Sequence, residues 1–110
     1  MGTGWLMVKG APVLLALLSF SAMAQTTAEV RIEGYKFLPP EVTIRAGDSV
    51  RWVNGEKRTS HSVLFPAEGG RESDRMFPDE NWQRQFAEPG CYDYTYGPHP
   101  EMKGVVIVVE

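Results

Sequence analysis

Short stretches that alternate between apolar and polar residues run through most of the chain, and turn residues separate them. Alternation with a period of two predicts strands with one buried face. Outside the first 24 residues, no apolar series with helical spacing is sustained. The pattern predicts an all-β domain of seven to eight strands, folded as a sandwich or barrel. The clearest predicted strands are 29–33, 41–45, 49–54, 59–65, 81–86, 91–96 and 103–110. The polar segment 66–80 predicts a loop whose charges lie in solvent.

The start of the chain has a different pattern. Lys9 precedes the apolar run 11–20, and Ala22 and Ala24 then form the small-x-small pattern of a cleavage site. The apolar run is shorter than the roughly 20 residues that a membrane-spanning helix needs. These features predict a secretory signal peptide, 1–24, and a single exported domain, 25–110, located in the periplasm and free of the membrane after cleavage. An uncleaved N-terminal anchor is the alternative.

Charge and cysteine content narrow the possible partners. Without Lys9 the chain keeps ten basic against fourteen acidic residues, so the predicted domain has a net charge of −4. No basic stripe is present to neutralise phosphates, which argues against nucleic acid as a partner. Cys91 is the only cysteine, so an internal disulfide is impossible. We expect a monomer, with an intermolecular disulfide through Cys91 as the alternative.

Metal-binding chemistry gathers near the C-terminus. The chain has only two histidines, His61 and His99. His61 falls in the predicted strand 59–65, and His99 falls in a proline-rich loop with Met102 three residues further on. Two imidazoles and a thioether suit copper, and the thioether favours Cu(I). The prolines on both sides of His99 stiffen the loop before a metal arrives. The residues therefore predict a site for one copper ion, as Cu(I), Cu(II) or both.

Three stretches carry a family resemblance: AGDSVRWVN leading to an H-S-V strand, the EPG-Y-D-Y strand, and PHPEMKGVVIVV. With these stretches, the chain from about residue 29 to the end resembles a small cupredoxin, most closely of the amicyanin type and then of the pseudoazurin type. The resemblance implies a Greek-key sandwich with copper at one end, bound by His61, His99 and Met102. It also implies that Tyr92 forms a tyrosine corner.

Three residues depart from the cupredoxin pattern. Tyr96 occupies the position three before His99 where an amicyanin-type protein has its ligand cysteine. Ser62 replaces the asparagine that steadies the cysteine sulfur. Glu101 puts a carboxylate on a rim that electron carriers of this type keep apolar. We therefore predict a thiolate-lacking metal site of His61, Tyr96, His99 and Met102.

Cys91 does not replace the missing thiolate. Side chains alternate along a strand, so Cys91 and Tyr96 lie on opposite faces. They are also separated by about 17 Å, at about 3.3 Å per residue. Two roles remain open for Tyr96. It either binds Cu(II) as a phenolate or stays a pocket residue, which leaves a His61, His99 and Met102 set suited to Cu(I).

These residues favour copper handling, meaning the binding, buffering or transfer of the ion, with a periplasmic redox or copper-trafficking protein as partner. One alternative is a small periplasmic electron-transfer protein, as the family resemblance implies. A second is a metal-free interaction domain in which Tyr96 fills the pocket. We do not expect an enzyme, because Glu101 is the only acid–base group near the loop.

Overall fold

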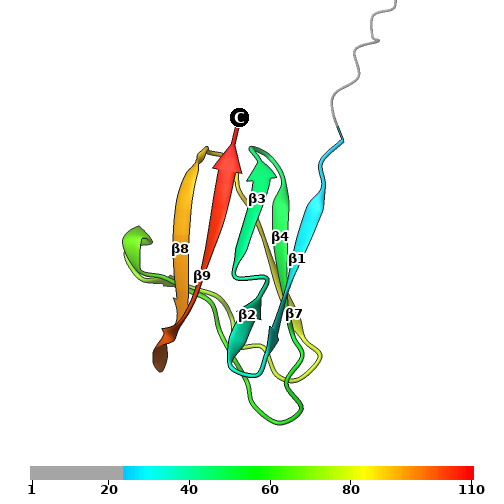
Figure 1. The fold of residues 1–110 in the computed structure, drawn as a ribbon, viewed down its shortest axis with the longest axis vertical. Helices are drawn as coiled ribbons and strands as arrows, with labels where there is room; N and C mark the ends of the chain where they lie inside the picture. The colour runs from blue at the N-terminus through cyan, green and yellow to red at the C-terminus, as the bar shows by residue number, and fades with distance from the viewer. Residues whose placement is uncertain (1–23) are drawn as a thin grey trace, which may run out of the picture.

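The computed structural model of the protein describes residues 24–110, and within this range it is all-β (Figure 1). The strands are β1 (Thr27–Glu33), β2 (Lys36–Leu38), β3 (Glu41–Arg45), β4 (Ser49–Asn54), β5 (Leu64–Phe65), β6 (Arg71–Glu72), β7 (Asn81–Gln85), β8 (Gly90–Tyr96) and β9 (His99–Val109). A short 3₁₀ turn, η3 (Pro66–Glu68), follows β5. The predicted signal peptide, 1–24, lies outside the described residues apart from Ala24. No helix in the described part of the chain is long and apolar enough to cross a membrane.

The strands form two sheets that pack face to face. The four-stranded sheet has the order β2-β1-β4-β7, and the five-stranded sheet has the order β3-β9-β8-β5-β6. The pairs β1–β4 and β3–β9 are parallel, and the other pairs are antiparallel. The predicted all-β sandwich is confirmed. The structure has more strands than predicted because β2 and β6 have only three and two residues, too few to show alternation.

Aromatic side chains from both sheets fill the core. Trp52 on β4 and Tyr94 on β8 are fully buried, and their rings meet edge to face with centroids 5.2 Å apart. Gly104 on β9 pairs with Tyr94, and a Cβ atom at Gly104 would overlap the Tyr94 ring. The absence of a side chain at Gly104 therefore leaves room for the Tyr94 ring against β9.

The alternation predicted along β8 is confirmed. Tyr94 and Tyr96 are buried, whereas Cys91 is exposed as a free thiol on the other face. The hydroxyl of Tyr92 donates a hydrogen bond to the carbonyl of Glu88 at 2.6 Å. A bond from a strand tyrosine back to the backbone a few residues upstream is a tyrosine corner, as predicted.

Two predicted element boundaries are wrong. The strand expected at 59–65 is reduced to β5, and His61 lies before it in an isolated bridge with Met76. The reason is Asn54, whose side-chain amide donates to the carbonyl of Thr59 and so folds this segment into a loop. His99, expected in a loop, is the first residue of β9 and pairs with Tyr96 in a tight hairpin.

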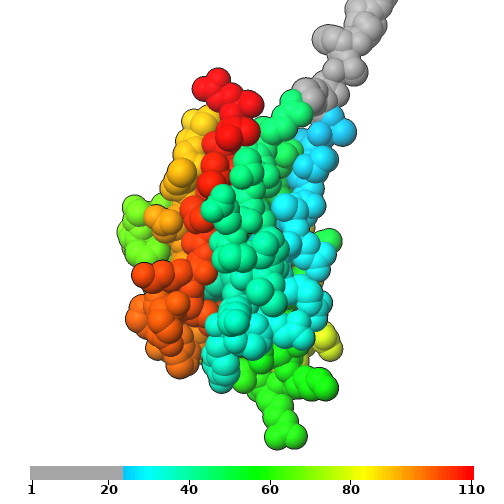
Figure 2. All heavy atoms as spheres, in the orientation of Figure 1, coloured from blue at the N-terminus to red at the C-terminus, as the bar shows by residue number. Residues whose placement is uncertain are grey.

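One end of the sandwich brings together segments that are far apart in the sequence. The β8–β9 turn and the β1–β2 turn lie side by side at the lower end of the molecule in Figures 1 and 2, where edge-to-face contact joins Tyr35 to His99. The His61–Met76 bridge contributes to the same end, because Tyr35 also contacts the ring of His61. This end of the fold therefore carries both histidines.

Candidate metal centre

The structure brings three of the four predicted ligand residues into ring contact. The centroid of the Tyr96 ring lies 4.8 Å from that of His61 and 5.6 Å from that of His99. His61 and Tyr96 are buried, whereas the His99 side chain is 45% exposed at the edge of the domain. The site is therefore reached from solvent on the His99 side.

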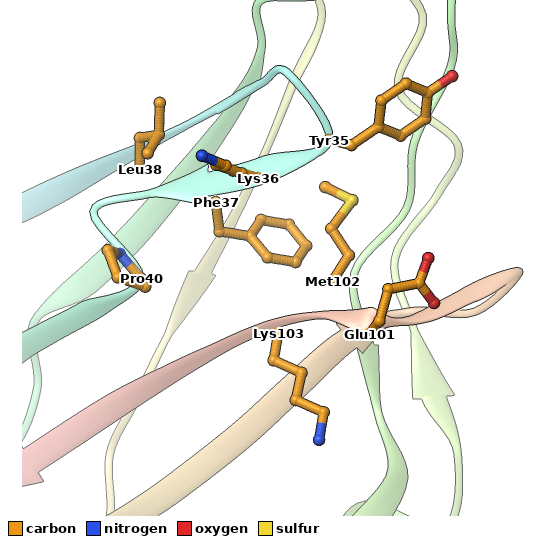
Figure 3. A pocket seen from close by; sticks show the side chains of 8 residues that line it. All are labelled: Tyr35, Lys36, Phe37, Leu38, Pro40, Glu101, Met102 and Lys103. Atoms are coloured by element: carbon orange, nitrogen blue, oxygen red, sulfur yellow. The ribbon is translucent and has the colours of Figure 1, made fainter.

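Met102, the fourth predicted ligand, lies three residues along β9 and is buried. Its side chain lines a groove with a cavity volume of about 180 Å³ between β2 and the start of β9. Figure 3 shows its thioether pointing toward Tyr35, whose ring contacts both imidazoles with centroids 6.0 Å from His61 and 5.6 Å from His99. Tyr35 therefore borders both the groove that Met102 lines and the two imidazoles.

His61 has an unusual environment for a polar side chain. Both of its ring nitrogens are buried, and neither has a hydrogen-bond partner. Burial lowers the pKa of His61 below its ordinary value of 6.5; Arg75 and His99 lower it further, while Glu56 opposes them. The imidazole is therefore neutral at neutral pH, which is the form that binds metals. An unpaired buried nitrogen, at the end of the fold that also carries His99 and Met102, fits copper by ligand chemistry.

The backbone around His61 is held firmly. His61 and Met76 exchange two backbone hydrogen bonds, of 3.0 Å and 2.8 Å. The fully buried amide of Asn54 donates to the carbonyl of Met76 at 2.9 Å and to that of Thr59 at 2.8 Å. These bonds fix the position of the His61 imidazole without any bond to its ring.

His99 has one ring nitrogen close to a carboxylate. Its Nδ1 lies 3.2 Å from Oε2 of Glu101, whose side chain is 75% exposed. With the proton on Nδ1, this nitrogen donates a hydrogen bond to the carboxylate, and the other ring nitrogen keeps its lone pair for a metal. Carboxylates often orient metal-binding histidines in this way.

The hydroxyl of Tyr96 is bonded on both its donor and acceptor sides. It accepts a hydrogen bond from Nη2 of Arg75 at 2.7 Å and donates one to the carbonyl of Ser60 at 3.2 Å. The guanidinium carbon of Arg75 also lies 5.6 Å from the centroid of the Tyr96 ring. Tyr96 is thus tied to the His61–Met76 region as well as to its own sheet.

Sequence reasoning missed three residues that shape this end of the fold. Tyr35 was not singled out, although Gly34 before it signals a turn. Arg75 is exposed as predicted, yet its guanidinium bonds to Tyr96. Glu72 accepts a hydrogen bond from the Ser62 hydroxyl at 2.6 Å. The contacts of Arg75 and Glu72 depend on which loops meet in the fold, so no local pattern indicates them.

The candidate ligands are not a conventional cluster of charged groups. Residues 24–110 contain no group of three or more His, Cys, Asp or Glu side chains that could hold a metal ion. A metal at this end would therefore rely on the thioether of Met102, the phenol of Tyr96, or both. A soft thioether in the ligand set favours copper over zinc or magnesium.

Comparison with known proteins agrees with this chemistry. The family model described as "Copper binding proteins, plastocyanin/azurin family" matches residues 24–109, so the chain belongs to this family of cupredoxins. It is 46% identical over 83 residues to an amicyanin from Paracoccus versutus, covering 72% of this chain and 62% of that protein. It is 39% identical to amicyanin-alpha from Methylorubrum extorquens, covering 84% and 92%. A solved Cu(I) form of an amicyanin mutant is 34% identical and superposes with a TM-score of 0.71, covering 78% of this chain and 85% of that one.

Proposed function

We propose that this protein binds one copper ion through His61, His99 and Met102, and that it handles the ion rather than relaying electrons through a blue site. The observation that carries the proposal is the His61 side chain, buried with both ring nitrogens unpaired. A buried polar atom without a partner costs free energy. A bound metal would remove that cost at one nitrogen.

The donor set favours the reduced ion. Two neutral imidazoles and a thioether carry no negative charge, and the thioether is a soft ligand that suits Cu(I). Blue copper sites instead depend on a short bond from the metal to a cysteine sulfur. Cys91 is exposed on the far face of β8, whereas Tyr96 occupies the buried position beside the imidazoles. Intense blue absorption is therefore not expected.

Tyr96 stays a proposed fourth member of the site. Its ring lies against both imidazoles, which supports a place in the wall of the metal pocket. Its hydroxyl is already bonded to Arg75 and Ser60, which weighs against direct ligation.

Electron transfer is the second candidate function. The family includes amicyanins and plastocyanins, and the partly exposed His99 offers an edge from which a redox partner could reach the metal. This candidate requires copper that changes oxidation state reversibly and quickly. The missing thiolate and the carboxylate of Glu101 at the rim both count against it. No observation favours a metal-free interaction domain, and the unpaired ring nitrogens of His61 count against it. For either copper function, the pattern of residues 1–24 supports an exported protein.

Copper affinity tests the proposal. Purified protein, kept anaerobic with a reductant, competes with a chromogenic Cu(I) chelator, and Cu(II) is tested separately with a Cu(II) chelator. We expect one Cu(I) ion per chain, bound more tightly than micromolar, and a loss of at least about tenfold in His61→Gln and in Met102→Leu. No affinity tighter than micromolar for either oxidation state would overturn the proposal. Reversible voltammetry with fast electron exchange would favour the electron-transfer candidate instead.

A further inference from the structure

Two hydrogen bonds engage the hydroxyl of Tyr96, one in which it accepts and one in which it donates. These bonds affect which oxidation state of copper the site accepts. A phenol has one proton to donate and lone pairs to accept with. Here the proton points to the carbonyl of Ser60 at 3.2 Å, and the oxygen accepts from the guanidinium of Arg75 at 2.7 Å. Hydrogen bonds that involve a charged group are about twice as strong as neutral ones.

The two partners of this hydroxyl are placed by the same backbone that holds His61. Ser60 precedes His61, Arg75 precedes Met76, and His61 and Met76 are bridged by two backbone hydrogen bonds. The side chains of Arg75 and Ser60 also bond to each other, from Nε to Oγ at 3.0 Å. Arg75 and Ser60 are therefore held beside this bridged pair and beside each other.

The phenol oxygen lies at the far end of the Tyr96 ring, whereas the sulfur of a cysteine lies one bond beyond Cβ. In this structure the ring of Tyr96 contacts both imidazoles, with centroids 4.8 Å and 5.6 Å away. Its oxygen instead reaches the loop that carries Arg75. The ring and not the oxygen thus forms the side of the pocket next to His61 and His99.

We propose that Arg75 and the carbonyl of Ser60 form a latch that keeps the Tyr96 oxygen out of the copper coordination sphere, so that the site selects Cu(I) over Cu(II). This inference rests on the proposed copper function. For the phenol to bind Cu(II), it would have to release its proton to solvent and break its bonds to both latch partners. Arg75 is thus a positioning residue that acts on the metal through Tyr96.

The latch mainly changes the affinity of the site for Cu(II). Cu(I) prefers the imidazole and thioether set and gains little from a hard oxygen ligand, whereas Cu(II) gains a strong ligand from a phenolate. Removing the charged donor therefore leaves Cu(I) affinity within about threefold. The expected rise in Cu(II) affinity is about tenfold, because releasing the phenol oxygen from its charge-assisted hydrogen bond outweighs losing a cation that favours the phenolate.

The test is a Cu(II) titration of the predicted mature domain, residues 25–110, as the wild type and Arg75→Leu, followed by visible absorption. Leucine keeps an apolar side chain, removes every donor and adds no metal ligand. We expect no phenolate charge-transfer band in the wild type, a band in Arg75→Leu, and its loss in the double variant Arg75→Leu/Tyr96→Phe. Arg71→Leu is the matched control, because Arg71 is an exposed arginine of the nearby strand β6. The control should behave as the wild type does.

Arg75→Lys is the conservative variant. It keeps the charge and a donor, so the band should stay absent or weak. A phenolate band of full intensity in the wild type would overturn the latch. So would an Arg75→Leu variant that folds, by its circular dichroism, and leaves both the spectrum and the Cu(II) affinity unchanged.

Cu(I) affinity, measured on the same samples, separates this inference from the proposed function. Tight Cu(I) binding that coexists with either overturning result leaves the copper function intact and removes only the latch. Absence of binding for both oxidation states overturns the function and the latch together.

Discussion

Replacing His61 with leucine should make the metal-free protein more stable and abolish its copper affinity. His61 is fully buried, and both of its ring nitrogens are without hydrogen-bond partners. Each unpaired buried polar group costs about 1–3 kcal/mol of folding free energy. Leucine has a similar volume and no polar atoms, so both costs disappear.

The expected gain follows from these two unpaired nitrogens. Their combined cost, reduced by about 1 kcal/mol for imperfect packing of the new side chain, predicts that the free energy of unfolding of the metal-free variant rises by about 1–5 kcal/mol. Bound copper reverses this order when its stabilisation exceeds that gain, so that the wild type becomes more stable than the variant. An ion present at about 100 times its dissociation constant stabilises the folded protein by about 2.7 kcal/mol, and the variant gains none of this.

Urea unfolding measures the free energy of unfolding of the wild type and of His61→Leu, each with and without anaerobic Cu(I). His99→Leu is the matched control. It also removes an imidazole, but from a half-exposed position. It should lose copper stabilisation without any gain in the metal-free state. A metal-free His61→Leu protein that is less stable than the wild type by more than about 1 kcal/mol would refute the reasoning.

Three further predictions concern pH, an ion pair and the free thiol. Burial lowers the pKa of His61 below 6.5. As the pH falls below 6.5, this histidine is therefore protonated in the unfolded chain before it is protonated in the folded one. The metal-free wild type should therefore lose stability between about pH 7 and pH 5, and His61→Leu should lose less, as urea unfolding at each pH will measure. Glu68→Gln should cost about 2 kcal/mol in the same assay and leave Cu(I) affinity unchanged, because it weakens a bidentate pair at 2.7 Å with Arg84, whose side chain is only 8% exposed. Cys91→Ser should abolish any disulfide dimer on a non-reducing gel without altering Cu(I) competition, because the exposed thiol lies away from the site. A changed Cu(I) affinity in this variant would contradict that placement.

The parts of the fold that could be predicted from sequence are those set by local periodicity. The alternation through 91–96 placed Tyr94 and Tyr96 inside and Cys91 outside, because successive side chains of a strand face opposite ways. This prediction does not depend on which strands pair with each other. It also excluded Cys91 as a replacement thiolate.

Where side chains bond to the backbone, the same reasoning failed. The segment 59–65 has the composition of a strand, but the amide of Asn54 donates a hydrogen bond to the carbonyl of Thr59, and the chain there forms a loop. His61 is positioned by that loop and by Met76. Bonds of this kind compete with sheet formation, and residue propensities do not show them.

The surroundings of the candidate site depend on tertiary contacts. Arg75 and Tyr96 are 21 residues apart, and Tyr35 reaches both histidines from the β1–β2 turn. None of the three positions carries a motif that links it to the others. The candidate ligands could be named from residue type and family resemblance, whereas the hydrogen bonds that direct Tyr96 could not.

X-ray absorption of the Cu(I)-loaded protein in a Cys91→Ser background tests the central claim most directly. In that background a sulfur bound to copper can come only from a methionine, and loss of the sulfur in Met102→Leu assigns it to Met102. We expect two imidazole nitrogens and one sulfur around the metal, with the sulfur lost in Met102→Leu. A coordination shell of nitrogen and oxygen without sulfur in the protein that retains Met102 would contradict a thiolate-free Cu(I) site built from His61, His99 and Met102.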